Sequence, residues 1–488
     1  MEFMLKTIIE KQDEAGIESA KLTPSVRWAL AGLSLSMLLS SLGTSSANVA
    51  LPTLAQAFNA SFQEVQWIVL AYLLAITTLI VSVGRLGDMI GRRRLLVTGI
   101  SLFTIASVLC GIAPNLWLLI AARAAQGLGA AIMMTLSMAF IGETVPKERN
   151  GSAMGLLGTM SAIGTALGPS LGGILISGFG WQAIFLVNAP LGILTFLLAH
   201  RHLPVDRLEP KTDRAGFDNA GTLLLALTLA AYALAMTIGR GSFGPLSAAL
   251  LLFAVFGVGL FVVVEARSSS PLIRLAIFHE PGLSAGLTMS ALVSTVLMAT
   301  LVVGPFYLSR SLGLDAGLVG IVMSIGPLVV ALTGVPVGRM VDSLGARTMT
   351  VLGLIGITAG SLILSMIPAS FGIPGYIMPI VVITVGYAMF QTANNTFVMK
   401  DVPPEQRGVI SGVLNLSRNL GLITGTAVMG AVFAFASEMT DITTAPAEAV
   451  AAGLRITFAV AAVLIIVALA IAVRRVSNRV TVSVPNNM

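Results

Sequence analysis

The sequence predicts an all-α integral membrane protein with fourteen transmembrane helices. Of its 488 residues, 56% are hydrophobic and only 10% are charged, and the mean hydropathy is +0.93. Soluble domains are far less apolar than this. Apolar runs of about 20 residues, the length that crosses a bilayer, are predicted as helices at 27–48, 64–83, 94–112, 116–140, 152–177, 182–199, 219–239, 245–265, 283–308, 315–337, 348–367, 375–398, 409–436 and 454–473.

Basic residues between these runs predict how the chain is oriented. Lys and Arg fall mostly in every second loop, which is typical of loops on the cytoplasmic side. Both termini are therefore expected in the cytoplasm, in a multi-pass protein of a bacterial-type cytoplasmic membrane, that is, a cell inner membrane. Residues 1–26 mix charges of both signs and lack the apolar core of a cleavable signal, so the first helix should direct insertion.

Composition also limits the classes of function. The net charge of +6 arises from these short loops, so no nucleic-acid partner is expected. A single cysteine, Cys110, cannot build a disulfide framework or a cysteine metal site. The apolar runs hold no cluster of His, Asp, Glu or Cys, which argues against an enzyme, a metal site or a cofactor. A receptor or scaffold should carry a larger hydrophilic domain, so both classes are disfavoured. The expected partners are the bilayer and a small-molecule substrate, and the expected state is a monomer.

A charged stretch of ten residues occurs twice, as GRLGDMIGRR at 84–93 and GRMVDSLGAR at 338–347. Each copy directly follows an apolar run, which predicts a tight charged turn between two helices that acts as a conformational gate. Glycine permits a sharp turn, and aspartate can cap the next helix or pair with arginine. The predicted gate residues are Gly84, Arg85, Asp88, Gly91, Arg92 and Arg93 in the first copy and Gly338, Arg339, Asp342, Gly345 and Arg347 in the second.

The repeat extends beyond this stretch and predicts two related six-helix halves. Gly155, Gly164 and Gly168 recur 257 residues later as Gly412, Gly421 and Gly425. Duplicated bundles usually place a solute pathway between the halves. The expected parts are an N-terminal tail (1–26), an N-terminal bundle (27–200), a linker (201–218), two inserted helices (219–266), a C-terminal bundle (267–475) and a C-terminal tail (476–488).

These motifs carry a resemblance to the major facilitator superfamily. The stretch 84–93 and its second copy resemble the signature loop of that family. Three further patterns are similar to its fourth-helix motif, its fifth-helix antiporter motif and the sixth-helix pattern of its fourteen-helix drug:proton antiporter branch. The residues are, in that order, Leu119, Arg123, Gln126, Gly127 and Gly129; Gly155, Gly164, Gly168, Pro169, Gly172 and Gly173; and Trp181, Phe185, Asn188, Pro190 and Gly192.

The resemblance implies a major facilitator fold, with two six-helix bundles plus two inserted helices, and a secondary transporter working by alternating access. The branch implies proton-linked export of drugs or metabolites, with protons as a further partner. In the fifth helix, the glycines remove side chains from one face and Pro169 weakens the hydrogen-bond ladder, so a partner helix can approach and the helix can bend. Close packing alone is the alternative explanation.

Two arginines lie inside apolar runs. Burying Arg123 in the fourth helix costs ~2.5–3.5 kcal/mol on insertion scales, so its side chain should face the interior rather than reach to the interface. The resemblance implies that Arg123, with Gln126 one turn on, takes part in coupling or substrate binding. Arg418 in the thirteenth helix is the second candidate cation, and a helix-packing or gate contact explains it equally well.

The sequence departs from the drug-exporting branch at Gly43, where that branch usually carries an aspartate. None of the 22 acidic residues falls in the middle of an apolar run, and Glu64 is the first to consider as an unrecognised coupling group. The alternative function is therefore uptake of a neutral or anionic aromatic nutrient, such as the vitamin riboflavin. The expected lining is neutral and polar, although many of its side chains could only bridge helices: Ser41, Thr44, Asn48, Tyr72, Gln126, Asn188, Tyr307, Tyr387, Gln391, Asn394 and Asn395.

Overall fold

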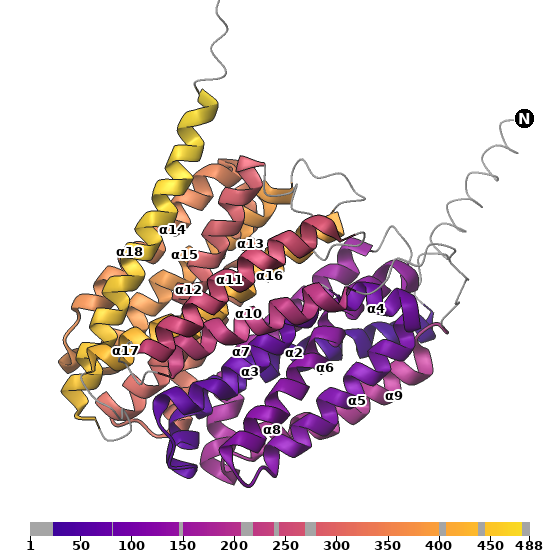
Figure 1. Ribbon diagram of the computed structural model, residues 1–488, viewed down its shortest axis with the longest axis horizontal. Coiled ribbons are helices and arrows are strands. Elements are labelled where there is room, and N and C mark those ends of the chain that lie inside the picture. Colours follow the sequence, from indigo (N-terminus) through magenta and orange to yellow (C-terminus); the bar gives the residue numbers. More distant parts are fainter. Residues whose placement is uncertain are drawn as a thin grey trace, which may run out of the picture.

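A computed structural model describes residues 23–80, 82–145, 150–205, 218–238, 244–268, 280–399, 407–437 and 445–480. Within these ranges the regular structure is helical, and fourteen spans are long and apolar enough to cross a membrane. The fourteen predicted helices are thereby confirmed. Figure 1 shows them as two groups, the N-terminal helices in indigo and purple and the C-terminal helices in orange and yellow.

The N-terminal bundle contains six spans and one short helix. Thr23 starts the first span by accepting a hydrogen bond from the Val26 amide, and Asn115 caps the fourth by accepting one from Leu118 at 2.9 Å. The helices are α2 (Pro24–Ala57), α3 (Phe62–Ile80), α4 (Val83–Ile90), α5 (Arg92–Gly111), α6 (Leu116–Thr144), α7 (Asn150–Phe179), α8 (Ala183–Leu186) and α9 (Asn188–His202), the last two forming one span.

The C-terminal bundle repeats this plan. Two of its spans contain a π-helical segment, η3 (Tyr307–Ser311) and η6 (Gly425–Met429), and a short 3-10 helix, η4 (Ala369–Phe371), precedes α15. Its helices are α12 (Pro281–Phe306), α13 (Ala316–Leu344), α14 (Ala346–Met366), α15 (Gly372–Met399), α16 (Arg407–Thr424), α17 (Gly430–Ala436) and α18 (Ala447–Val480).

Helix packing shows the duplication directly. In the N-terminal bundle, Gly164 of α7 faces the Leu38 carbonyl of α2, where an added Cβ would lie 2.4 Å from the oxygen. In the C-terminal bundle, Gly421 of α16 faces the Ala291 carbonyl of α12 in the same way, at 2.2 Å. Only glycine lets two helix backbones approach this closely. The predicted fold of two six-helix bundles is therefore what the chain adopts.

The inserted pair consists of α10 (Asn219–Thr237) and α11 (Pro245–Arg267) and lies along the seam between the bundles (Figure 1). The Trp67 indole of α3 donates to the Thr237 hydroxyl of α10 at 3.0 Å, and the hydroxyls of Ser82 and Thr222 lie 3.1 Å apart. Much of α11 is exposed, Leu252 by 71% for example, so this helix presents an apolar surface outward. The pair is thus attached to the N-terminal bundle through α3.

The repeated charged stretch is mostly helical, and this corrects the prediction of a tight turn. Residues 83–90 form α4, and the second copy continues α13 as far as Leu344. The chain turns only at Gly91 (φ 100°) and Gly345 (φ 83°), in a backbone region that side chains rarely adopt. Glycine, at Gly91 and Gly345, occupies the N-cap position of each following helix, so no N-cap side chain is available there. Arg93 instead donates to the His200 carbonyl at the end of α9.

These two glycines lie at the same end of the molecule, here named the Gly91 end. The opposite end, which carries the turn between α7 and α8 at Gly180 (φ 84°), is named the Gly180 end. The linker and the two tails of the predicted domain division fall largely outside the described residues, so its boundaries remain predictions.

Candidate functional site

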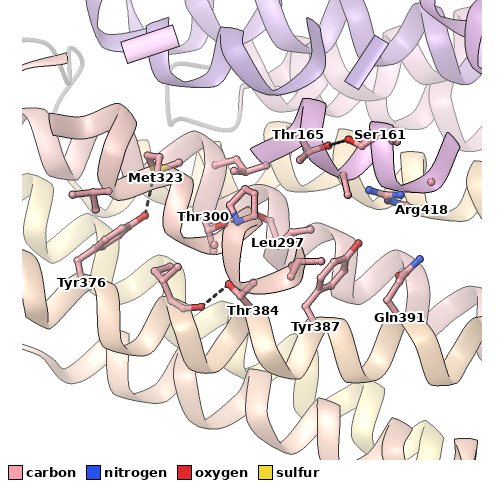
Figure 2. Close-up of a pocket in the computed structure, with 18 residues that line it drawn as sticks. Ser161, Thr165, Leu297, Thr300, Met323, Tyr376, Thr384, Tyr387, Gln391 and Arg418 are labelled. Atoms are coloured by element: carbon pink, nitrogen blue, oxygen red, sulfur yellow. Dashed lines mark hydrogen bonds between the residues drawn. The ribbon is translucent and has the colours of Figure 1, made fainter. Parts of the chain in front are cut away.

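A cavity of about 290 Å³ lies between the two bundles. The N-terminal bundle contributes residues of α7 alone, and the C-terminal bundle supplies the remaining lining from α12, α13, α15 and α16 (Figure 2). Apolar side chains such as Leu297, Val322 and Ile380 cover most of the wall. The polar or aromatic members are Ser161, Thr165, Thr300, Tyr376, Thr384, Tyr387, Gln391 and Arg418.

The polar lining residues divide into two kinds. Thr165 and Thr384 donate to carbonyls of their own helices, at 3.0 and 2.6 Å, so their hydrogens are already used. No side-chain hydrogen bond joins Tyr387, Gln391 or Arg418 to any other described residue. Figure 2 shows the hydroxyl of Tyr387 and the amide of Gln391 pointing from α15 toward Arg418. These three groups are available to a solute in the cavity.

Arg418 borders a second, smaller cavity of about 110 Å³. Gln391 lines both cavities, and Asn395 and Asn415 add two amides to the smaller one. Its wall includes Met399, the last residue of α15, so it lies closer to the Gly91 end than the main cavity does. The guanidinium therefore stands where a mainly apolar chamber meets a mainly polar one.

The bundles are closed against each other toward the Gly180 end. Gly173 of α7 and Gly320 of α13 pack backbone to backbone, since a Cβ on Gly173 would lie 2.9 Å from the Gly320 Cα. On the other side of the interface, the Gln66 amide donates to the Thr426 carbonyl of η6 at 2.9 Å. The ring of Phe62 meets that of Phe306 edge-on at 4.7 Å. Solute cannot leave the cavity through this packed region.

Toward the Gly91 end the same two helices separate. A Cβ placed on Gly158 of α7, or on Gly334 or Gly338 of α13, would meet no atom within 4 Å. Gly158 also lines the cavity. The interface is therefore tight at one end of α7 and open at the other, and the cavity communicates with the Gly91 end.

Arg123 lies in the core of the N-terminal bundle, as predicted, and is completely buried. Its guanidinium donates to the carbonyls of Ile68 and Gly43, each at 3.0 Å, and to the Gln126 side chain at 2.6 Å. The ring of Tyr72 stacks on it at 4.1 Å, a cation–π contact. Only Nη2 lacks a hydrogen-bond partner.

This network ties four helices of one bundle together. Gln126 extends the network to α5 by donating to the Ser107 hydroxyl at 2.7 Å, and Tyr72 extends it to α2 by donating to the Ser40 carbonyl at 2.8 Å. None of these residues borders either cavity. Gly43, where the drug-exporting branch carries an acid, supplies the carbonyl that holds Arg123, and a Cβ there would meet Tyr72 and Phe103 at 3.2 Å.

The structure thus separates the residues that the sequence placed in one lining. Tyr387, Gln391 and Arg418 border the main cavity, and Asn395 borders the smaller one. The amide of Asn48 turns back to a carbonyl of α2, and that of Asn188 in α9 to the Ile184 carbonyl of α8 in the same span, at 3.2 Å each. Asn394 joins α15 to the Gly286 carbonyl of α12 at 3.1 Å. Outside the cavity walls lie Ser41, Thr44, Asn48, Tyr72, Arg123, Gln126, Asn188, Tyr307 and Asn394.

Some lining residues were not anticipated from the sequence. Tyr376 lines the cavity, its hydroxyl contacts the Met323 sulfur at 3.6 Å, and its ring is backed from outside the wall by Tyr307, with the ring centroids 5.8 Å apart. Ser161 and Thr165 stand one turn apart on α7, on either side of Gly164. Two hydroxyls one helical turn apart, next to a glycine that packs against α2, are the sequence signal that could have located them.

The antiporter-motif residues of α7 pack against two different helices, α2 and α13. Gly164 and Gly168 pack against α2, and Gly172 makes ordinary contact with Ser46 of the same helix. Gly173 packs instead on α13, where the Pro169 carbonyl also meets Gly320. Gly155 lies near the start of α7, where side-chain surroundings are outside the described part of the structure.

Acidic side chains are absent from the described walls of both cavities. Glu64 forms a capping box at the start of α3, accepting hydrogen bonds from the amide and hydroxyl of Ser61 at 2.7 and 2.6 Å. Asp315 likewise caps α13 through the Leu318 amide at 2.9 Å. Both carboxylates are therefore used in capping the starts of helices.

Fourteen apolar spans, a duplicated bundle and a cavity between the halves that carries a few polar groups together define a polytopic membrane transport protein. A sequence profile described as the Major Facilitator Superfamily matches residues 33–426. The chain belongs to that superfamily, and its substrates are small molecules.

Relatives of known name fall into two groups. The chain is 31% identical to the riboflavin transporter RibZ of Clostridioides difficile, over 81% of this chain and 86% of that one. It is 32% identical to the multidrug resistance protein Stp of Mycobacterium tuberculosis, over 79% and 72% of the two chains. It is 30% identical to the multidrug efflux pump LfrA of Mycolicibacterium smegmatis, over 88% and 85%.

Solved structures agree on the fold. A bacterial homologue of the human lysosomal transporter Spinster, in an inward-facing conformation, superposes with a TM-score of 0.68 at 16% identity. The match covers 93% of this chain and 97% of that one. The two chains therefore share the major facilitator architecture.

Proposed function

We propose that the protein moves a small organic solute across the cytoplasmic membrane by alternating access through the cavity between its bundles. The observation that carries this proposal is the contrast along α7, which packs on α13 at Gly173 and stands clear of it at Gly158. A cavity closed at one end and open at the other is one of the two states that alternating access requires. Rocking of the bundles about the cavity would produce the other state.

The Gly91 end is proposed to face the cytoplasm, which puts both termini there. Basic residues gathered at that end, such as Arg93 and Arg347, support this orientation under the positive-inside rule. The two charged stretches would then act as the gate at the cytoplasmic end, each pivoting on the single glycine turn at Gly91 or Gly345. In this orientation the structure corresponds to a state open to the cytoplasm.

Proton-linked export of drugs or metabolites is the first proposed direction. It is supported by the relatives named as efflux pumps and by the antiporter-type glycine series of α7. A carboxylate is the usual proton carrier within a membrane. Since none lines the described cavity walls, coupling in this chain would have to use another group.

Uptake of a neutral or anionic aromatic nutrient is the second candidate. The absence of an acid from the described lining favours it, because a cation in a dry cavity needs a counter-charge. Similarity to a riboflavin transporter adds support. Aromatic and amide groups such as Tyr387 and Gln391 suit the rings and heteroatoms of such a solute.

Solute flux in proteoliposomes distinguishes the two candidates. A cationic dye and riboflavin would each be followed with and without an imposed pH gradient, beside vesicles that contain no protein. Gradient-dependent movement of the dye would support proton-linked export, whereas riboflavin movement that ignores the gradient would support uptake. If neither compound, nor any wider panel of small organic solutes, moves faster than in protein-free vesicles, the transport proposal is wrong.

A further inference from the structure

We infer that the cavity recognises an aromatic solute that carries a negative charge, with Arg418 as the residue that binds the charged group. This inference rests on the proposal that the cavity is the path of the solute, and it adds the chemical class. It applies to export and uptake alike.

The first argument is that Arg123, which is completely buried, and Arg418, which is partly buried, have different surroundings. The guanidinium of Arg123 is saturated on three sides by Ile68, Gly43 and Gln126 and is separated from the cavity. The guanidinium of Arg418 lines both cavities and has no hydrogen bond or ion pair with any described residue. Its Nε is shielded from solvent and still unpaired.

A buried donor without a partner is unfavourable unless something else supplies the acceptor. The guanidinium offers several N–H donors in a planar fork, which fits the two oxygens of a carboxylate or the oxygens of a phosphate. Because no acidic residue stands among the described lining residues, the protein itself does not neutralise this charge inside the cavity. An anionic solute would do so, and a cationic solute would be repelled.

The second argument is the division of the site into two chambers. The main chamber has an apolar wall with the rings of Tyr376 and Tyr387, and it suits an aromatic ring system. The smaller chamber adds the amides of Asn395 and Asn415 beside Gln391. With Arg418 at the junction, the arrangement fits a molecule whose ring occupies one chamber and whose charged end lies toward the other.

Three probes with one ring system test the charge preference. They are naphthalene-2-carboxylate, its uncharged carboxamide, and naphthalen-2-ylmethylamine, which is a cation at neutral pH. Binding would be measured by equilibrium dialysis with the whole protein in nanodiscs of phosphatidylcholine, a lipid without net charge. The carboxylate should bind about tenfold to hundredfold more tightly than the carboxamide, the range expected for a charge-assisted hydrogen bond, and the amine should bind least.

Variants then assign the preference to one residue. Arg418→Gln should bring carboxylate binding down to that of the carboxamide. Arg418→Lys keeps the charge but loses the fork, so it should retain part of the preference. Arg455→Gln is the matched control, because Arg455 is an exposed arginine of α18 outside both cavities. It should leave the preference unchanged.

Several results would overturn the inference. They are equal binding of carboxylate and carboxamide by the unaltered protein, tightest binding of the amine, or an unchanged preference in Arg418→Gln. The first two need no variant, so the test holds even if Arg418→Gln does not fold. Counterflow of the same probes in proteoliposomes separates this inference from the transport proposal. Flux without carboxylate preference would refute only the anion site, while carboxylate-selective binding without flux would refute only transport.

Discussion

A cross-link across the closed end should stop transport. Ser177 of α7 and Gly317 of α13 face each other near the Gly180 end, and a Cβ built on Gly317 lies 3.9 Å from the Ser177 Cβ. Disulfides in proteins have Cβ atoms about 3.5–4.5 Å apart, so the double variant Ser177→Cys/Gly317→Cys should oxidise without moving either helix. The bond would fix the bundles in the closed arrangement at this end.

The size of the effect follows from the geometry. Each molecule either carries the bond or does not, so solute flux should fall in proportion to the cross-linked fraction. Flux in proteoliposomes and the cross-linked fraction from non-reducing mass analysis would be measured on the same sample. Reducing agent should restore the flux, because the helices have not been displaced.

The native thiol does not interfere with this experiment, since Cys110 is buried in the N-terminal bundle. Each single variant, oxidised in the same way, is the control and should keep its flux. Quantitative cross-linking with undiminished flux would refute the reasoning, because it would mean that α7 and α13 need not part at Ser177 during transport.

Three further outcomes are expected. Gly173→Ala should weaken the closed arrangement, since the Ala316 carbonyl oxygen would have to retreat by about 0.9 Å, from 2.5 Å to an ordinary contact of 3.4 Å. The rate of the cross-link described above should fall in Gly173→Ala and stay unchanged in the control Gly158→Ala, where the methyl meets open space. Equal cross-linking rates in the two variants would contradict this. Arg123→Ala should lower the free energy of unfolding by about 2–5 kcal/mol, as for other large buried side chains; a melting temperature equal to that of the unaltered protein would disprove it. Gln391→Ala, by contrast, should raise the KM for the transported solute severalfold at an unchanged melting temperature, and a fall in melting temperature like that of Arg123→Ala would show that Gln391 is structural.

The fold could be predicted from the sequence because the bilayer imposes a simple length rule. All fourteen spans were located from apolar runs, and the duplication was evident from glycines such as Gly164 and Gly421, which the structure places at equivalent helix contacts. Helix ends were harder to predict. The first span was expected at 27–48 and extends over Pro24–Ala57, because the helix continues past the bilayer-length run and through Pro52.

The charged stretches illustrate a second limit. Two glycines and three charged residues shared by both copies, in a position between apolar runs, predicted a turn, yet most of each stretch is helical. Nothing in residues 84–90 prevents helix formation, and a single residue at positive φ is enough to reverse the chain. Sequence motifs located the turn, but they overstated its length.

The site could be predicted only in part. A polar residue in a membrane helix can face a cavity, bridge two helices or bond to its own backbone, and all three keep it away from lipid. Asn48 and Asn188 bond to backbone carbonyls within their own spans, Asn394 bridges two helices, and Gln391 faces the cavity, although all four are similar in sequence context. Helical periodicity distinguishes lipid from interior and does not distinguish these interior environments.

The unequal lining of the cavity bears on how the protein arose and how it could be changed. The two bundles are related by an internal repeat, yet the N-terminal copy contributes only small residues of α7 to the cavity, and the C-terminal copy supplies the arginine, the amide and the tyrosines. The repeat therefore has two different roles: the C-terminal copy carries the polar groups of the cavity, and the N-terminal copy is a rigid bundle whose helices are joined through Arg123. A mutant library aimed at new substrates can be confined to α15 and α16, where changes leave that bundle untouched.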